Sequence, residues 1–428
     1  MRPPLLYDAV VFDLDGTLVA THRFWAQAAR TGARSALAAL GVAREVPSPR
    51  EWMALVGRPA DEAFATLFPE LPPAARAAIR EACFAEERRL LAAGGASLMP
   101  GAEETLRTLR AAGLRLAIAS NCSAPYLAHM QDALGLRALV AEARCLDSPG
   151  VADKADMVEQ VLAALGTRRA LMVGDRGLDR DAAWANGLPH VHCAFGFAPP
   201  DEDVAAEAVI EDLGELPALL ARRAAWIERA LALLGALPPP LPFVLGIDGP
   251  PAAGKTLFAS DVVRLLRGRR VPAGAVSLEA FRRPGANGGP DPARDPLGAA
   301  YDLDALRREV LDPAARGEPV RVRRTGGDRR GLPVLHAIDV PARAVLVLEG
   351  PFLADPRLRP RIDRLLRLEV PEALVLRRVG GREGRAGGPE PLERLRSVEL
   401  PARRAFDLRH DPARLADLVL DAANPLGA

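Results

Sequence analysis

Short, continuous apolar segments alternate with amphipathic segments along most of this chain. Because the apolar segments are hydrophobic at every position rather than at every second one, they are typical of parallel strands buried on both faces. Stretches of helical periodicity, such as residues 102–113, lie between them. The sequence therefore predicts an α/β fold with doubly wound parallel sheets. The clearest strand candidates are residues 8–13, 114–120, 170–175, 243–248 and 344–350.

A proline-rich segment divides this pattern into two parts. The chain has 428 residues, which exceeds what one ordinary hydrophobic core supports. Residues 235–243, GALPPPLPF, break any helix and form a stiff connector. We therefore predict two doubly wound domains, residues 1–238 and 239–428, with a linker helix over about 214–238 that leads into the prolines.

Two carboxylates end the first strand candidate, in the sequence FDLDGT. Asp13 and Asp15 are two residues apart, and at the carboxyl end of a parallel strand both can face the crevice where α/β proteins bind ligands. One carboxylate can attack phosphorus, and the other can protonate the leaving oxygen and then activate water. Since two clustered acids repel each other, the pair also requires a divalent cation. The pattern predicts a metal-dependent phosphoryl-transfer site.

Further polar residues stand at the ends of later segments. Ser120 ends the second strand candidate, and its hydroxyl can donate a hydrogen bond to a phosphoryl oxygen. Lys154 opens an amphipathic helix, where its ammonium can neutralise both a nucleophile and a phosphoryl group. Asp175 and Asp179 follow another strand candidate and can serve as additional metal ligands.

In this order, the four motifs resemble those of the haloacid dehalogenase-like (HAD) phosphatases, over roughly residues 6–215. The resemblance implies a Rossmann-like core, a Mg²⁺ cofactor and a small-molecule phosphate ester as substrate. It also implies that Asp13 is the nucleophile and Asp15 the acid and base, while Ser120 and Lys154 bind phosphate. The implied Mg²⁺ ligands are Asp13, the backbone carbonyl of Asp15, Asp175 and Asp179.

A long insertion follows the first motif. Residues 20–95 carry helical patterns and resemble the helical cap of phosphoglycolate phosphatase-like members of the family. Such a cap is expected to close over the site, exclude water and select the substrate.

A glycine-rich segment, GPPAAGKT, follows the strand candidate at residues 243–248. It fits the pattern GxxxxGK[ST] and precedes a helical stretch. Gly249 and Gly254 allow backbone N–H groups to curl around phosphate oxygens, and the helix N-terminus adds a favourable dipole. Lys255 can then reach the β- and γ-phosphates, and Thr256 can ligate Mg²⁺. The segment predicts an ATP-binding phosphate loop.

Lysine is rare in this chain, and both lysines fall in these phosphate motifs. Among 56 basic residues, Lys154 and Lys255 are the two that are not arginine. A compact ammonium fits a narrow phosphate cradle, whereas a planar guanidinium does not. The rarity of lysine therefore strengthens both predicted phosphoryl sites.

From about residue 241 to 423, the sequence resembles the uridine kinase-like branch of P-loop kinases, in segments such as VSLEAFRRP and VLVLEGPFL. The resemblance implies that ATP phosphorylates a small-molecule hydroxyl on a nucleoside-like or sugar-like acceptor. It implies that Glu279 accepts the proton of that hydroxyl and that Glu349 assists Mg²⁺. Arg378 and Arg382 fall where a lid would supply cations to the transferring group.

The acceptor region departs from the family pattern. Glu279 stands where Asp is usual, and Arg282 replaces an aromatic residue, which suggests an anionic or polar acceptor rather than a stacked pyrimidine. The main prediction is a bifunctional enzyme, a Mg²⁺-dependent phosphatase fused to a Mg²⁺–ATP kinase. One alternative makes the second half a catalytically inactive nucleotide-binding regulatory module. Another alternative is a phosphotransferase or a scaffold protein in which the first half only binds phosphate.

Composition and charge argue against several other classes of protein. The net charge is +1, with arginine and acidic residues interleaved, so we expect no nucleic-acid partner. No run of about 18 apolar residues occurs, and the N-terminus lacks the pattern of a signal peptide, so we expect no membrane span. Four widely spaced cysteines without a CxxC pair are expected to be reduced, structural thiols. These features predict a soluble cytoplasmic protein and leave its oligomeric state open.

Overall fold

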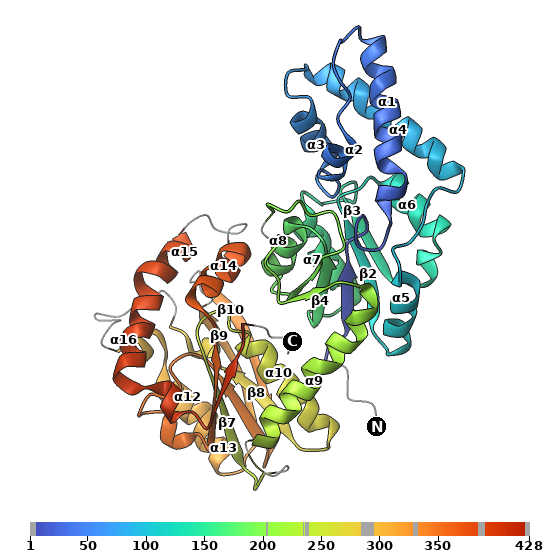
Figure 1. The fold of residues 1–428 in the computed structure, drawn as a ribbon. Coiled ribbons are helices and arrows are strands. Elements are labelled where there is room, and N and C mark those ends of the chain that lie inside the picture. Colours follow the sequence, from blue (N-terminus) through green and yellow to red (C-terminus); the bar gives the residue numbers. More distant parts are fainter. Residues whose placement is uncertain are drawn as a thin grey trace. The chain divides into compact units, whose positions relative to one another are not determined.

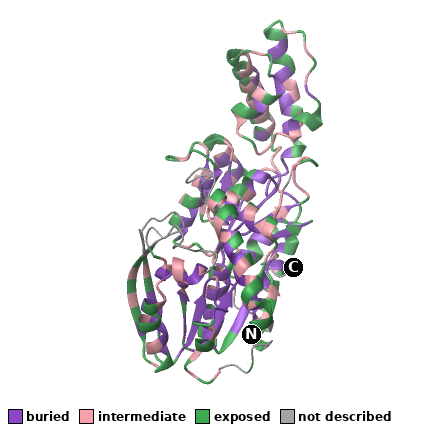
Figure 2. Ribbon diagram, turned by 90° about the vertical axis from the view of Figure 1, so that its left-hand side faces the viewer, coloured by how far each residue is buried: buried purple, intermediate pink, exposed green. Residues whose placement is uncertain are grey.

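Two parallel β-sheets, each in a unit of its own, organise the chain (Figure 1). One unit is Tyr7–Leu220, and the other is Ala221–Ala428 together with Met1–Leu6. The computed structural model describes residues 6–202, 204–233, 235, 239–283, 295–327, 333–383 and 390–423. The central strands of both sheets are buried (Figure 2), as their continuous apolar pattern predicted.

The first unit is built on a six-stranded sheet with the order β3-β2-β1-β4-β5-β6, and its strands are parallel. The central strand β1 pairs with β2 on one side and β4 on the other, so that Ala9 lies opposite Arg115 and Ala170. The prediction of a parallel α/β core is therefore confirmed. The strands are β1 (Ala9–Phe12), β2 (Arg115–Ser120), β3 (Glu142–Cys145), β4 (Ala170–Gly174), β5 (His190–Cys193) and β6 (Ala208–Ile210).

Helices α7 and α8 cover one face of this sheet. Val158 and Val161 of α7 and Ala183 of α8 belong to the same buried cluster as Ala9 and Val11 of β1. The alternate residues of β1 point to the opposite face. The helices of the core are α5 (Ala102–Ala111), α6 (Ala124–Ala133), α7 (Lys154–Leu165) and α8 (Gly177–Ala185).

Four helices between β1 and β2 form the cap that residues 20–95 predicted. They are α1 (Trp25–Ala39), α2 (Pro49–Met53), α3 (Ala60–Leu67) and α4 (Pro73–Ala92), and α1 packs along α4. An aromatic cluster fills the space between them. Trp52 lies with its ring centroid 6.0 Å from Trp25, 5.4 Å from Phe64 and 6.0 Å from Phe68. This cluster gives the cap a core of its own.

The second unit has a five-stranded parallel sheet with the order β13-β12-β7-β11-β8. A two-stranded antiparallel ribbon, β9 and β10, adds a feature that the sequence analysis did not anticipate. The strands are β7 (Phe243–Asp248), β8 (Ala273–Ser277), β9 (Val320–Gly327), β10 (Pro333–Val340), β11 (Val345–Glu349), β12 (Arg364–Glu369) and β13 (Leu418–Asp421). The helices are α10 (Lys255–Gly268), α11 (Pro296–Ala300), α12 (Leu303–Leu306), α13 (Asp312–Ala315), α14 (Glu372–Glu383), α15 (Glu390–Arg394), α16 (Leu400–His410) and α17 (Pro412–Leu415).

Helix α9 (Leu216–Leu233) corresponds to the predicted linker helix. The division between the two units falls inside this helix, after Leu220. Its later turns belong to the second unit, where Arg223 forms a buried ion pair with Asp261 of α10, 2.9 Å from Nε to Oδ2. Trp226 packs edge-on against Phe258 nearby. Of the helices in the described residues, none combines the length and apolar character that a bilayer crossing requires.

Candidate functional site

Five predicted residues of the first unit meet at the carboxyl edge of its sheet. Asp13 follows β1, Ser120 ends β2 and Asp175 follows β4. Because these three strands are neighbours, the side chains that follow them lie at the same edge. Lys154 begins α7 and Asp179 lies in the first turn of α8. All five side chains are buried.

A buried ammonium joins two of the carboxylates. Nζ of Lys154 lies 2.6 Å from Oδ1 of Asp13 and 2.5 Å from Oδ1 of Asp179. The helix presents Lys154 at this point because Asp153 and Asp156 form a capping box that fixes where α7 begins. Burial alone lowers the pKa of Lys154, but attraction to the two carboxylates outweighs burial and raises the pKa, so the ammonium stays charged.

Three carboxylates crowd around this ammonium. Oxygens of Asp13, Asp175 and Asp179 all lie within 4.8 Å of one another. Burial raises the pKa of Asp13 to about 7, against the attraction of Lys154. Burial, together with repulsion from Asp13, holds the pKa of Asp175 well above its usual value. A single ammonium does not balance three buried anions, so the cluster favours a further cation.

The atoms of this cluster fit a hard divalent cation. Oδ2 of Asp13 and Oδ1 of Asp175 are buried without a hydrogen-bond partner among the described residues. Glycines leave room for the carboxylates, since a Cβ at Gly174 would stand 2.3 Å from Asp179 and one at Gly196 would stand 2.1 Å from Asp175. Such unpaired carboxylate oxygens are the ligands that Mg²⁺ prefers.

Two hydroxyl groups, rather than the ammonium, hold the side chain of Asp15. Its Oδ1 accepts hydrogen bonds from Thr21 at 2.5 Å and from Tyr126 at 2.6 Å. Burial raises the pKa of Asp15, and these two hydrogen bonds oppose that shift. Tyr126 was not predicted from the sequence, although its residue type is rare, since the chain contains only three tyrosines.

Two residues at the edge of the sheet donate hydrogen bonds to the backbone of the loop between cap helices α2 and α3. Nδ2 of Asn121 donates to the carbonyl oxygen of Gly57 at 2.8 Å, and Nη1 of Arg176 donates to that of Val56. Arg176 is buried and forms an ion pair with Glu202 at 2.8 Å. Since Asn121 and Arg176 each directly follow a residue of the carboxylate site, they hold this cap loop beside it.

In the second unit, the glycine-rich segment forms the turn between β7 and α10. Gly249 has a φ of 157°, and a Cβ there would stand 2.6 Å from the carbonyl oxygen of Leu368. Gly254, with a φ of 79°, directly precedes α10. Both conformations favour glycine. Lys255 begins the helix, and its Nζ donates to the carbonyl oxygen of Pro250 at 2.7 Å.

The two residues predicted to hold Mg²⁺ in the second unit lie together. Oγ1 of Thr256, in the first turn of α10, donates to Oε1 of Glu349 at 2.9 Å. Glu349 ends β11, which is a neighbour of β7 in the sheet, and its side chain is buried. A hydroxyl and a carboxylate oxygen at this spacing are a suitable ligand pair for Mg²⁺.

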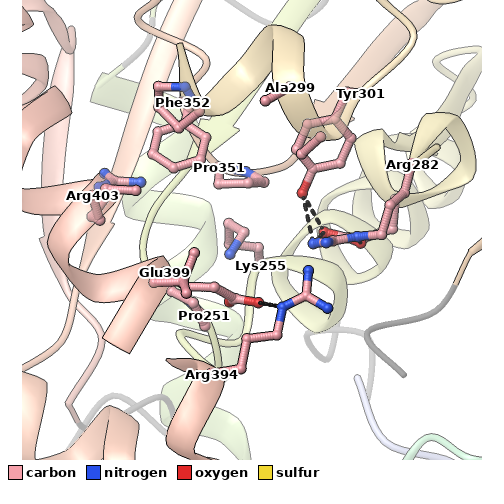
Figure 3. Close-up of a pocket in the computed structure, with 15 residues that line it drawn as sticks. Pro251, Lys255, Arg282, Ala299, Tyr301, Pro351, Phe352, Arg394, Glu399 and Arg403 are labelled. Carbon is pink, nitrogen blue, oxygen red and sulfur yellow. Dashed lines mark hydrogen bonds and ion pairs between the residues drawn. The ribbon is translucent and has the colours of Figure 1, made fainter. Parts of the chain in front are cut away.

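Glu279 lines a pocket beside the same turn. Figure 3 shows this pocket, with Lys255, Arg282 and Tyr301 among its labelled residues. Its Oε2 accepts a hydrogen bond from Nε of Arg282 at 2.7 Å, and its Oε1 accepts one from the hydroxyl of Tyr301 at 2.8 Å. Lys255 also lines this pocket. Arg282 was noted from the sequence, whereas Tyr301, which lies between helices α11 and α12, was not.

Of the two arginines predicted to lie in a lid, the structure describes the side chain of Arg378 but not that of Arg382. Arg378 of α14 is buried, and its guanidinium donates to the carbonyl oxygens of Ala252 at 3.2 Å and Ala423 at 2.9 Å. It therefore joins the backbone of the glycine-rich turn to the residues that follow β13. The side chain of Arg382 lies outside the described residues.

Comparison with known proteins places the first unit in a family. Residues 7–187 match the haloacid dehalogenase-like hydrolases. The phosphoglycolate phosphatase of Cupriavidus necator is 31% identical over 229 residues, which cover 50% of this chain and 92% of that protein. The tyrosine-protein kinase PtkA of Mycobacterium tuberculosis is 31% identical over 201 residues, which cover 45% of this chain and 64% of that protein.

A solved structure, CbbY from Rhodobacter sphaeroides in complex with phosphate, is 26% identical and has a TM-score of 0.40, covering 49% of this chain and 96% of that one. The family match includes every residue of the carboxylate and lysine cluster and ends before the second unit. Since the chain spans nearly the whole of the C. necator phosphatase, it belongs to the haloacid dehalogenase-like hydrolases through a phosphatase domain in its first half.

Proposed function

We propose that the first unit hydrolyses a small phosphate monoester through a phosphoryl-enzyme intermediate on Asp13. The observation that carries this proposal is the buried contact of Lys154 with Asp13, within a cluster that also contains Asp175 and Asp179. In this cluster the ammonium holds the carboxylate in place and offsets its charge as an anionic phosphate approaches.

The two aspartates of the first motif have separate roles. An oxygen of Asp13 forms a bond to phosphorus while the bond from phosphorus to the ester oxygen breaks, and Asp15 gives a proton to that leaving oxygen. Asp15 then takes a proton from the water that attacks the phosphoryl-aspartate, which regenerates Asp13. Hydrogen bonds from Thr21 and Tyr126 orient Asp15 for both transfers.

The remaining residues bind the phosphate and the metal. Ser120 and Lys154 would contact phosphoryl oxygens. Bound Mg²⁺ would supply electrostatic stabilisation of the transferring group. Its ligands would be Asp13, the backbone carbonyl of Asp15, Asp175 and Asp179.

The substrate that we propose is a small molecule. The C. necator relative is a phosphoglycolate phosphatase, and the helical cap, whose loop is bound by Asn121 and Arg176, limits access to the carboxylate cluster. A compact phosphate ester is therefore the substrate class that this enclosed site favours.

Replacing the nucleophile tests the hydrolase proposal. We expect Asp13→Asn to lower the release of phosphate from p-nitrophenyl phosphate by at least about 10³-fold, because an amide does not attack phosphorus. Asp132→Asn is the matched control, since Asp132 lies on the surface in an ion pair with Arg137. Equal turnover in wild type and Asp13→Asn would contradict the proposal.

For the second unit, we propose an ATP-dependent kinase that phosphorylates a small-molecule hydroxyl. The turn geometry of Gly249 and Gly254 and the pairing of Thr256 with Glu349 support it. Lys255 would contact the β- and γ-phosphates, Thr256 and Glu349 would hold Mg²⁺, and Glu279 would receive the proton of the acceptor.

A second candidate for this unit is a catalytically inactive nucleotide-binding module that regulates the phosphatase. The observation that favours it is the ion pair of Glu279 with Arg282, because a paired carboxylate is a weaker proton acceptor. Calorimetric titration of the full chain with Mg²⁺–ATP, followed by assays of ADP formation, separates the two. Binding of ATP without acceptor-dependent formation of ADP would favour the regulatory module. In either case, Lys255→Ala should abolish ATP binding, whereas the surface variant Arg316→Ala should not.

A further inference from the structure

The two aromatic rings that line the pocket beside Lys255 offer no open face to a ligand. Tyr301 is 1% exposed and Phe352 is 9% exposed. The guanidinium carbon of Arg282 lies 5.2 Å from the centroid of the Tyr301 ring, and that of Arg403 lies 5.5 Å from the Phe352 ring (Figure 3). A flat aromatic ligand would have to displace an arginine before it could stack on either ring.

The arginines of the pocket wall are already paired with carboxylates. Arg282 is 2.7 Å from Glu279, and Arg394 is 3.8 Å from Glu399. Arg403 is 3.2 Å from the fully buried Asp248 at the end of β7. An anionic ligand would compete with these carboxylates, and it would leave a buried or half-buried carboxylate without its partner.

Besides Lys255, which the proposed nucleotide site uses, and the paired Glu399, the pocket offers a ligand apolar carbon and the carboxylate of Glu279. Pro296, Ala299 and Pro351 contribute carbon surface to the lining. The Glu279 carboxylate, oriented by Arg282 and Tyr301, accepts hydrogen bonds from donors such as hydroxyl groups. Neighbouring hydroxyls on a saturated carbon skeleton match both features.

We infer that this pocket takes an uncharged, non-aromatic compound with several hydroxyls, a polyol or an unphosphorylated sugar, as the acceptor of the phosphoryl group. The inference rests on the proposed kinase function, and it excludes nucleosides and anionic alcohols as preferred acceptors. Tyr301 is then a positioning residue that orients Glu279.

The transfer itself is balanced with ATP as the donor. The acceptor oxygen forms a bond to the γ-phosphorus while the bond from that phosphorus to the β,γ-bridging oxygen breaks. The electron pair leaves with ADP. The hydroxyl proton passes to Glu279 and from there to solvent, and no group is oxidised or reduced.

Binding of three acceptor classes to the full chain tests the inference. The classes are neutral polyols and sugars (glycerol, ribitol, glucose), nucleosides (uridine, adenosine) and an anionic alcohol (glycerate). Each is titrated calorimetrically with and without Mg²⁺ and adenylyl imidodiphosphate. We expect at least one neutral polyol or sugar to bind about tenfold more tightly than every nucleoside and the anionic alcohol. Tighter binding of a nucleoside or of glycerate, or no binding by any polyol or sugar, would overturn the inference.

The same titrations keep this inference separate from the proposed kinase. Failure of the nucleotide analogue to bind counts against the kinase proposal, while the acceptor ranking without nucleotide still tests the pocket. Arg282→Ala uncovers the Tyr301 ring, and we expect it to raise nucleoside affinity by about tenfold, the gain of one stacked base. Arg321→Ala, at a side chain that is 81% exposed, is the matched control. If Arg282→Ala does not fold, Tyr301→Phe is used in its place. Tyr301→Phe removes the hydroxyl that orients Glu279, so we expect it to weaken the binding of polyols and to leave the binding of adenylyl imidodiphosphate unchanged.

Discussion

Lys154 is the side chain on which the carboxylate cluster of the first unit most depends. Its ammonium contacts Asp13 and Asp179 in a fully packed interior. We expect Lys154→Arg to lower phosphate release by at least about 100-fold, because the larger planar guanidinium displaces one of these carboxylates. We expect Lys154→Met to cost about 3–5 kcal/mol in the free energy of unfolding, since it leaves two buried anions without their cation.

Phosphate release and urea unfolding measure these two effects. Arg107→Lys, an exchange of the same two residue types at a surface ion pair with Glu103, is the control and should change neither. Full turnover in Lys154→Arg would mean that this cluster does not bind phosphate.

His190 of β5 makes the first unit sensitive to acid. The ring is fully buried, and burial lowers its pKa to about 4. Above the ordinary pKa of about 6.5, the ring is neutral in both the folded and the unfolded state, so His190 itself does not change stability there. Between about pH 6.5 and pH 4, the unfolded state binds a proton that the folded state excludes, so the contribution of His190 to the free energy of unfolding falls by up to about 3 kcal/mol.

Unfolding measured across this pH range tests the assignment. His190→Gln removes the titrating group, so its stability should fall less steeply with acid than that of the wild type. The surface variant Arg107→Lys, in the same unit, is the control, and its pH dependence should match the wild type because neither residue type titrates in this range. A His190→Gln curve parallel to the wild type would contradict the prediction.

A buried ion pair joins helices α9 and α10, next to their apolar contacts. Arg223 is 1% exposed and Asp261 is fully buried. We expect Arg223→Ala to destabilise the second unit by about 3–5 kcal/mol, because it removes a buried cation that contacts the carboxylate of Asp261. The neighbouring Arg222 is exposed, so Arg222→Ala should change stability little.

A double variant distinguishes loss of charge pairing from loss of packing. Arg223→Met with Asp261→Leu replaces both charges by apolar groups and should recover much of the stability lost in Arg223→Ala. If the double variant is as unstable as the single one, the ion pair is not the source of the destabilisation.

At the scale of the whole molecule, each of the large buried hydrophobic clusters among the described residues lies within one of the two units. We therefore expect two thermal transitions in calorimetry. Mg²⁺ alone should raise the midpoint of the first unit, because it offsets repulsion among Asp13, Asp175 and Asp179. Mg²⁺ together with adenylyl imidodiphosphate should raise the midpoint of the second unit. A chelator should reverse the shift that Mg²⁺ causes in the first unit and should abolish phosphate release. Equal shifts of both transitions by Mg²⁺ alone would contradict the prediction that Mg²⁺ binds the carboxylate cluster of the first unit.

The sequence was informative wherever a single local pattern determines the structure. Continuous apolar runs predicted the buried parallel strands, and residues placed directly after those strands, such as Asp13 and Asp175, met as expected. Contacts that join distant segments were not predictable. Tyr126 reaches Asp15 across 111 positions of sequence, and Tyr301 reaches Glu279 from another element. Rarity was an unused signal, because two of three tyrosines orient predicted catalytic carboxylates, just as both lysines mark the phosphate motifs.

The position of Arg223 has a practical consequence for anyone who divides this gene. The prolines after residue 237 look like the natural place to cut, yet a C-terminal fragment that starts there would lack the cation that neutralises Asp261. An N-terminal fragment that stops there would carry Ile227 and Leu231 on an uncovered helical tail that invites aggregation. A boundary between Leu220 and Ala221 would keep Arg223, Ile227 and Leu231 in the same product as Asp261.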